Sequence, residues 1–307
     1  MEIKMWTKIP LEENIAKYLL DNPKRANEKI TELTKGLDKD SIETIYRIVS
    51  RLQKSLLNGN KPVLQTKAEK AEAEKIESEF EPNVHMITPN KFYYNGYFLP
   101  ILHFEIGVFW HKHSMNVFSK NTLEKIQNSD IIDVGGFIGD SALIFREFTK
   151  QKIHTFEATS KNFTLIQKTL ELNESSQIIA NKLALGDKKG TLTFNYFGSG
   201  SSAMHGVGSK TEEVEVDTLD NYVAKNNVKV GFIKVDIEGS ENLFLQGALD
   251  TIRTQKPAML ISIYHHPEQF FGIKPFLESL NLGYTFKIHK PVDYTIACET
   301  ALFCEVL

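Results

Sequence analysis

Residues 133–140, with the sequence Asp-Val-Gly-Gly-Phe-Ile-Gly-Asp, place a glycine-rich turn directly after the short apolar run of Ile131 and Ile132. An apolar, helix-like run from Ser141 to Phe148 follows the turn. A buried strand, a glycine turn and a helix N-terminus together form the arrangement with which an open α/β sheet holds a nucleotide-like ligand. This feature therefore predicts an α/β fold with a ligand site at the end of its first strand.

Apolar strand-like segments and helix-like segments alternate through the rest of this region. We expect further strands at residues 153–157, 178–180, 232–236 and 259–264, and helices at residues 162–172 and from Ser240 onward. Near-continuous apolar strands between helices are typical of a parallel sheet that is covered on both faces. Residues 284–289 and 301–306 suit an antiparallel pair at the sheet edge. The pattern predicts a Rossmann-like, mostly parallel sheet.

The first 80 residues predict helices, because their apolar residues recur with the 3.6-residue period. Asp40 and Glu43 are spaced as a capping box, and residues 58–62 should end the helix that follows. Residues 67–79, rich in Lys, Ala and Glu, predict a solvated helix. We expect two domains, a helical region at 1–85 for oligomerisation or substrate capping and a second domain at 86–307.

Aromatic segments lie at the start of the second domain. Residues 92–94, 97–99 and 109–110 indicate strands, with Gly96 in a turn between the first two.

Composition limits the partners and the compartment. The net charge of −3 gives no basic bias toward nucleic acid or an anionic membrane. The two cysteines, Cys298 and Cys304, form no disulfide framework and fit a reducing compartment. No apolar run reaches 18 residues, and residues 1–6 lack the apolar core of a signal peptide. We therefore expect a cytoplasmic protein with no nucleic-acid partner and no membrane span.

The glycine spacing indicates which ligand the turn holds. A dinucleotide fingerprint requires glycine at its first, third and sixth positions, and in the set that ends at Gly139 the first position is Val134. The Asp-x-Gly-x-x-x-Gly pattern instead resembles the first motif of S-adenosylmethionine (SAM) methyltransferases. The candidate cofactor residues of the turn are Asp133, Gly135, Gly136, Gly139, Asp140 and Ser141.

Three later segments add candidates for the same ligand. Glu157 lies 24 residues after Asp133, at the end of the second strand, where a carboxylate can accept bonds from both ribose hydroxyls. This spacing suits both SAM and NAD. Ala184 and Leu185 are candidates for packing on the adenine face. Asp236, at the end of the fourth strand, is a candidate for binding the amino group of SAM.

Five segments in order resemble the FkbM family of SAM-dependent methyltransferases. They are residues 133–141, 156–162, 216–220, 233–241 and 261–268, and the run Ile-Lys-Val-Asp-Ile-Glu-Gly-Ser-Glu at 233–241 is the most specific. The resemblance covers residues 98–306. It implies a class I methyltransferase fold, SAM as cofactor, and O-methylation of sugars, glycans, polyketides or other secondary metabolites.

The candidates for catalysis follow the fourth and fifth strands. His265 and His266 titrate near neutrality, so either can take the proton of an acceptor hydroxyl. Asp236 and Glu238 are two residues apart and would point to one side of an extended chain. With His265 they suit Mg²⁺ or Mn²⁺, which would orient and acidify the hydroxyl. Glu241 is expected in the first turn of a helix, either as a cap or as a catalytic group.

Two other classes of function remain open. An NAD-linked Rossmann oxidoreductase would use the same sheet, although the first glycine of its fingerprint and a Tyr-x-x-x-Lys pair are missing. A non-catalytic module that keeps the SAM fold would use the N-terminal helices to recruit a partner. Binding of NADH without SAM, or of SAM without turnover, distinguishes these alternatives from a methyltransferase.

Overall fold

A computed structural model describes residues 10–197, 200–202 and 211–307. The prediction drawn from residues 1–6 lies outside these ranges. The chain divides into two compact units. Unit 1 contains the residues up to Asn83 together with Glu105–Val117 and Ser262–Cys304, and unit 2 contains Val84–Phe104, Phe118–Ile261 and Glu305–Leu307. The predicted domain boundary at residue 85 stays a prediction.

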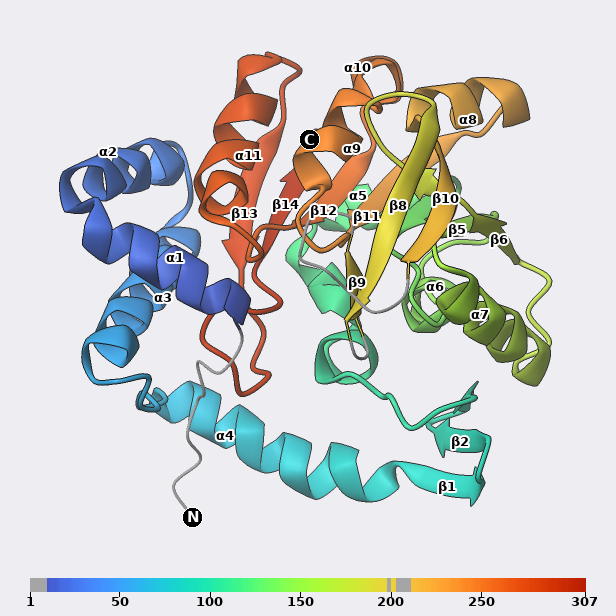
Figure 1. Cartoon of the computed structure of the whole chain (residues 1–307), viewed down its shortest axis with the longest axis horizontal. Helices are drawn as coiled ribbons and strands as arrows, with labels where there is room; N and C mark the ends of the chain where they lie inside the picture. Colours follow the sequence, from blue (N-terminus) through green and yellow to red (C-terminus); the bar gives the residue numbers. More distant parts are fainter. Residues whose placement is uncertain (1–9, 198–199, 203–210) are drawn as a thin grey trace. The chain divides into compact units, whose positions relative to one another are not determined.

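Unit 2 is built on a parallel sheet (Figure 1). Its strands lie in the order β12-β11-β4-β5-β6, and each neighbouring pair is parallel. They are β4 (Asp130–Val134), β5 (Ile153–Glu157), β6 (Ile178–Lys182), β11 (Val230–Val235) and β12 (Ala258–Ser262). All five strands lie where the apolar runs predicted them. The mostly parallel sheet of the sequence-based expectation is confirmed.

The strand order places a switch point between β4 and β11. From β4 the chain proceeds to β5 and β6 on one side, and it returns as β11 on the other side of β4. In open α/β sheets, ligands bind beyond the carboxyl ends of the strands at such a point. The turn at residues 133–140 begins at the end of β4, and the residues after Val235 begin at the end of β11. Both segments therefore lie at this switch point.

One helix of unit 2 precedes β4, and the others lie between the strands in the chain. These helices are α5 (Lys120–Gln127), α6 (Asp140–Phe145), α7 (Ser160–Leu172), α8 (Leu219–Asn226), α9 (Glu241–Gln246) and α10 (Leu249–Gln255). Ser119, Thr159 and Thr218 cap α5, α7 and α8, because each side-chain oxygen accepts a bond from a backbone amide three residues later. Local sequence therefore fixes where these helices start.

Two smaller sheets complete unit 2. One has the order β7-β10-β8-β9, formed by β7 (Ala184–Leu185), β8 (Gly190–Phe197), β9 (Gly200–Ser202) and β10 (Thr211–Asp217). The other has the order β1-β2-β3, formed by β1 (His85–Thr88), β2 (Lys91–Tyr94) and β3 (Tyr97–Leu99). Gly96 joins β2 to β3 with a φ of 91°, so the turn predicted there is confirmed.

Unit 1 contains the predicted N-terminal helices. They are α1 (Pro10–Asp21), α2 (Pro23–Thr34), α3 (Lys39–Leu57) and α4 (Lys67–Lys75), followed by a π-helix at Ile76–Phe80. Their apolar faces are buried, for example at Leu19, Leu33 and Ile45. The same unit holds α11 (Pro267–Ser279) and the neighbouring strands β13 (Thr285–His289) and β14 (Ala301–Glu305). No described helix is long and apolar enough to cross a membrane.

Two local expectations are corrected in unit 1. The cap of α3 is Asp38, whose carboxylate accepts a bond from the amide of Ser41 at 2.8 Å, so the predicted capping box at Asp40 is wrong. Residues 109–110 lie in a π-helix, Ile106–Trp110, and not in a strand. The segment predicted as a solvated helix, residues 67–79, is helical and mostly exposed, and Ala73 and Ile76 are its buried residues. At residues 109–110, tertiary packing overrides local propensity.

Candidate functional site

The turn after β4 depends on its glycines. Gly135 and Gly139 have φ values of 82° and 86°, which favour glycine. A Cβ atom at Gly135 would lie 1.8 Å from the carbonyl oxygen of Asp236, and one at Gly136 would lie 2.1 Å from Oγ1 of Thr155. At Gly135 and Gly136 the turn therefore lies so close to Asp236 and Thr155 that no side chain fits at either glycine.

Backbone bonds hold the turn in one conformation. The amides of Gly135 and Gly136 both donate to the carbonyl of Phe156, at 3.1 and 2.8 Å. The amide of Asp236 donates to the carbonyl of Val134 at 3.1 Å, and that of Gly139 donates to Gly136 at 2.6 Å. The loop is thus fixed from β5 on one side and from β11 on the other.

Asp133 is fully buried beneath this turn. Its Oδ2 accepts a bond from Oγ1 of Thr155 at 2.7 Å, and its Oδ1 lies 3.3 Å from the ammonium of Lys234. Burial raises the pKa of Asp133, while Lys234 and Thr155 oppose that effect. The sheet register produces this arrangement, because Asp133 pairs with Thr155 on β5 and with Lys234 on β11.

Lys234 is a residue that the sequence-based reasoning missed. It is the last residue but one of β11 and lies among Phe232, Ile233 and Val235, which are fully buried. A lysine inside an apolar run was the available signal, since lysine is rarely buried without a partner. The partner, Asp133, lies 101 residues earlier, and only the pairing of β4 with β11 reveals it.

Glu157 ends β5 with its carboxylate oriented toward the turn. Its Oε2 accepts a bond from the amide of Phe137 at 3.1 Å, and its Oε1 accepts bonds from the amide and the hydroxyl of Thr159 at 2.9 and 2.7 Å. The side chain is buried, and burial raises its pKa against the opposing effect of these bonds. The glycine turn and the acidic strand end predicted separately are therefore in direct contact.

The start of α6 places Asp140 and Ser141 at the end of the same turn. Both residues are buried, and Oδ1 of Asp140 accepts a bond from the amide of Ser141 at 2.9 Å. Ala184 and Leu185 form β7, which pairs with β10. The adenine contact expected of these two residues stays a prediction.

The acidic segment after β11 is less regular than the sequence suggested. The strand ends at Val235, and Glu238 has a φ of 54°, so the chain is not extended between Asp236 and Glu238. The prediction that both carboxylates point to one side required an extended chain from Asp236 to Glu238, so it loses its basis. Asp236 is half-buried and Glu238 is exposed.

Glu241 acts as a local cap. Its Oε1 accepts bonds from the amides of Ile237 and Gly239 at 3.0 and 3.5 Å, and the residue is fully buried at the start of α9. Of the two roles open in the sequence, this geometry supports capping. It also stabilises the turn in which Asp236 and Glu238 lie.

Comparison with known proteins identifies this arrangement. The family model described as the methyltransferase FkbM domain matches residues 133–286, half of the chain. The chain belongs to this family. The match starts at Asp133 and includes the whole of the turn, Glu157, Lys234 and the acidic segment.

Two similar proteins bear the name methyltransferase. Methyltransferase 1 of Beauveria bassiana (strain ARSEF 2860) is 25% identical over 189 residues, which cover 53% of this chain and 75% of that protein. The crystal structure of the methyltransferase FkbM from Methylobacillus flagellatus KT has a TM-score of 0.59 and 18% identity, over 94% of this chain and 60% of that one. This chain thus spans less than two thirds of that second protein, and the likeness shows a common fold.

The candidate bases of this FkbM domain belong to unit 1. His265 is fully buried, with its ring centroid 4.2 Å from that of Tyr264, and His266 is half-buried at the N-cap position of α11. The amide of Ile263 donates to the carbonyl of Thr300 at 3.0 Å. The segment that carries the histidines is therefore tied to the loop before β14.

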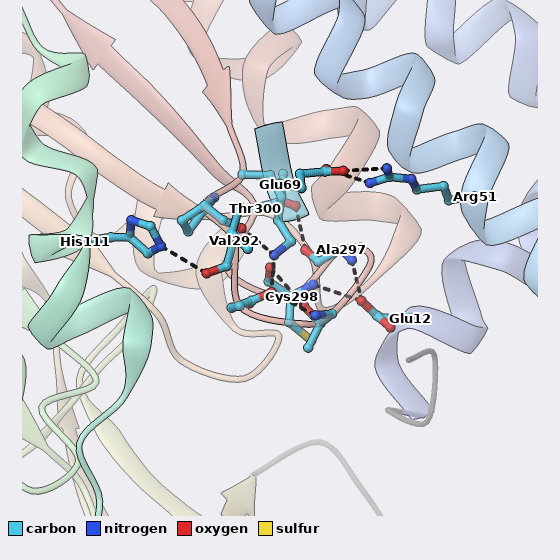
Figure 2. A network of polar contacts seen from close by, with 12 residues as sticks. Glu12, Arg51, Glu69, His111, Val292, Ala297, Cys298 and Thr300 are labelled. Carbon is cyan, nitrogen blue, oxygen red and sulfur yellow. Dashed lines mark hydrogen bonds and ion pairs between the residues drawn. The ribbon is translucent and has the colours of Figure 1, made fainter. Parts of the chain in front are cut away.

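A buried carboxylate from α1 orders the same loop (Figure 2). Oε1 of Glu12 accepts bonds from the amides of Ala297 and Cys298, the second at 3.0 Å. Burial raises the pKa of Glu12, although these two amides oppose that effect. The hydroxyl of Thr300 donates to the carbonyl of Ala297 at 2.5 Å. The N-terminal helices thus contact the loop that precedes β14 within unit 1.

Proposed function

We propose that this FkbM domain is a SAM-dependent O-methyltransferase acting on a hydroxyl of a small molecule or a glycan. The observation that carries the proposal is the contact between the fixed glycine turn and the carboxylate of Glu157. A nucleoside bound beyond β4 and β5 would meet this carboxylate with its ribose.

The roles of the cofactor residues follow from their chemistry. A ribose hydroxyl would add to, or replace, the bond that Oε2 of Glu157 accepts from Phe137. Asp236, half-buried at the end of β11, would bind the ammonium of SAM. The fixed turn would receive the methionine end, because it leaves room for no side chain at Gly135 and Gly136. Ala184 and Leu185 would pack on the adenine.

Methyl transfer forms a bond from the acceptor oxygen to the methyl carbon and breaks the bond from that carbon to sulfur. The sulfonium becomes a neutral thioether, and the proton of the hydroxyl passes to a base. We assign the base to His265 or His266, with typical contributions of roughly 10²–10⁴-fold to the rate. A divalent ion held by Asp236, Glu238 and His265 is the alternative way to acidify the hydroxyl.

Further parts of the proposal concern assembly and location. Helices of residues 1–85 would form a homo-oligomer or cap the acceptor, and size-exclusion chromatography with light scattering distinguishes these roles. Both cysteines are buried free thiols, which fits a reducing cytoplasm. The formal charge of −3 supports no nucleic-acid partner.

Calorimetric titration with S-adenosylhomocysteine tests the cofactor. We expect micromolar binding by the wild type, little binding of NADH, and a loss of affinity of at least tenfold in Glu157→Ala. Glu12→Gln is the control, because this buried carboxylate also accepts bonds from two backbone amides, those of Ala297 and Cys298 in unit 1. Absence of S-adenosylhomocysteine binding by folded wild-type protein would overturn the proposal, and NADH binding in its place would favour an oxidoreductase.

Turnover decides between the enzyme and a non-catalytic module. Incubation with SAM and a panel of sugars, glycans and hydroxylated metabolites should add 14 mass units at an oxygen of one acceptor class. Repeating the assay with EDTA tests the metal alternative. Binding of SAM with no methylated product across the panel would contradict the catalytic assignment.

A further inference from the structure

The ammonium of Lys234 lies under the glycine turn. The side chain is 5% exposed, and its Nζ donates to the carbonyl of Gly135 at 2.9 Å and to that of Val134 at 3.5 Å. The same atom lies 3.3 Å from Oδ1 of Asp133. One lysine therefore bonds two successive carbonyls of the turn and the carboxylate beneath it.

These bonds complete the fixation of the turn. The amides of Gly135 and Gly136 are held from β5 by the carbonyl of Phe156. The carbonyls of Val134 and Gly135 are held from β11, by the amide of Asp236 and by the ammonium of Lys234. The peptide between Gly135 and Gly136 is thus fixed at both ends, and Lys234 is the side chain that holds its carbonyl.

The charge of Lys234 persists despite its burial. Burial lowers the pKa of this lysine, but the carboxylates of Asp133, Asp236 and Asp140 raise it by more. The pKa of Lys234 therefore lies above its ordinary value. All three carboxylates belong to the candidate cofactor site. A buried charge is costly unless it is paired, and replacing both members of a buried ion pair by apolar residues of similar volume often leaves a protein equally stable. Stability alone gives little reason for a lysine inside β11.

We propose that Lys234 is a positioning residue for the cofactor, whose ammonium fixes the carbonyls of the glycine turn in the ligand-binding conformation before the ligand arrives. This inference rests on the proposed function, because it assigns the turn to the cofactor. It predicts that removal of the ammonium loosens residues 133–140 and weakens cofactor binding, beyond any effect on overall stability.

The chain offers a matched control in Lys274 on α11 of unit 1. This lysine is also buried, with a side chain 1% exposed, and it also bonds a carbonyl and a carboxylate: Lys35 at 2.8 Å and Glu278 at 3.0 Å. Lys234→Met and Lys274→Met each remove one buried ammonium and keep the apolar stem. Both variants should lower the melting temperature, and only the first should change the turn.

Two measurements test the inference. In titrations of folded protein, Lys234→Met should bind S-adenosylhomocysteine at least tenfold more weakly than the wild type, whereas Lys274→Met should stay within twofold. Hydrogen exchange of the ligand-free protein should accelerate in peptides that cover residues 133–140 of Lys234→Met, and not in the same peptides of Lys274→Met. If Lys234→Met does not fold, Asp133→Asn/Lys234→Met removes the unpaired carboxylate as well and should show the same two changes relative to Asp133→Asn.

The outcomes separate this inference from the proposed function. Unchanged affinity together with unchanged exchange at residues 133–140 would overturn the role of Lys234, even if the wild type binds S-adenosylhomocysteine tightly. If the wild type binds no S-adenosylhomocysteine, the proposed function fails and the cofactor role of Lys234 fails with it. The exchange measurement then still reports whether the lysine orders the turn.

Discussion

The ion pair between Arg51 on α3 and Glu69 on α4 gives a quantitative prediction for unit 1 (Figure 2). Two nitrogens of the Arg51 guanidinium donate to the two oxygens of Glu69, at 2.7 and 2.6 Å. Glu69 also completes a capping box, accepting a bond from the amide of Thr66 at 2.7 Å. Burial raises the pKa of Glu69, but the bonds from Arg51 and Thr66 outweigh it and lower this pKa from 4.5 to about 2.

The contribution of Glu69 to stability follows from its lowered pKa, because a pKa difference between the folded and unfolded states is a difference in free energy. A pKa lowered from 4.5 to about 2 corresponds to about 3 kcal/mol of stability when the carboxylate is ionised. The two side chains are only 11% and 12% exposed, so solvent screening removes little of it. Glutamine at this position retains an acceptor for Thr66. We therefore expect Glu69→Gln to lower the unfolding free energy of unit 1 by about 2 kcal/mol at pH 7.

The contribution of Glu69 to stability falls as the pH falls. Because the folded-state pKa is depressed, the contribution is fully present above pH 4.5 and is lost as the pH falls toward 2. The difference between wild type and Glu69→Gln should shrink over that window. Urea unfolding followed by the fluorescence of Trp110 measures it, since this indole donates to Glu72 on α4 at 2.7 Å.

The exposed ion pair between Lys29 and Glu32 serves as the control. Glu32→Gln breaks the pair between Lys29 and Glu32, whose side chains are 37% and 50% exposed, and should change stability by less than about 1 kcal/mol. A difference between wild type and Glu69→Gln that stays constant from pH 6 to pH 3 would show that the loss does not come from the ionised carboxylate.

Three further predictions concern the turn, the buried carboxylate of α1 and the candidate base. Gly135→Ala should abolish S-adenosylhomocysteine binding, because its Cβ meets Asp236 at 1.8 Å, whereas Gly96→Ala, with open space and a similar φ, should retain binding. Glu12→Gln should leave the unfolding free energy at pH 7 equal or higher, because the raised pKa of Glu12 means that its ionised form is disfavoured in the folded state. The difference in unfolding free energy between wild type and variant should vanish below pH 4.5. A loss of stability above about 1 kcal/mol at pH 7 would contradict this prediction. His265→Ala should lower kcat by roughly 10²–10⁴-fold with unchanged S-adenosylhomocysteine affinity, and full activity would exclude this histidine as the base.

The sequence by itself determined the elements of the parallel sheet and the identity of the turn. Apolar runs bounded by glycines and polar residues located β4, β5 and β11, because a strand buried on both faces needs near-continuous apolar residues. Gly135 and Gly139 are required locally by their positive φ values. These features depend on residues that are neighbours in the chain, so they are visible without the fold.

Only the tertiary structure decided which distant residues meet. Asp133, Thr155 and Lys234 come together because β4 lies between β5 and β11 in one register, and strand order is not encoded in any local pattern. The sequence placed the cap of α3 two residues too late, because Asp38 and Asp40 both precede the apolar run and the structure shows that Asp38 accepts the bond from the Ser41 amide. Glu12 reaches Ala297 across 285 positions. A buried polar group must find a partner, but the sequence does not say where, and the packing of the chain supplies it.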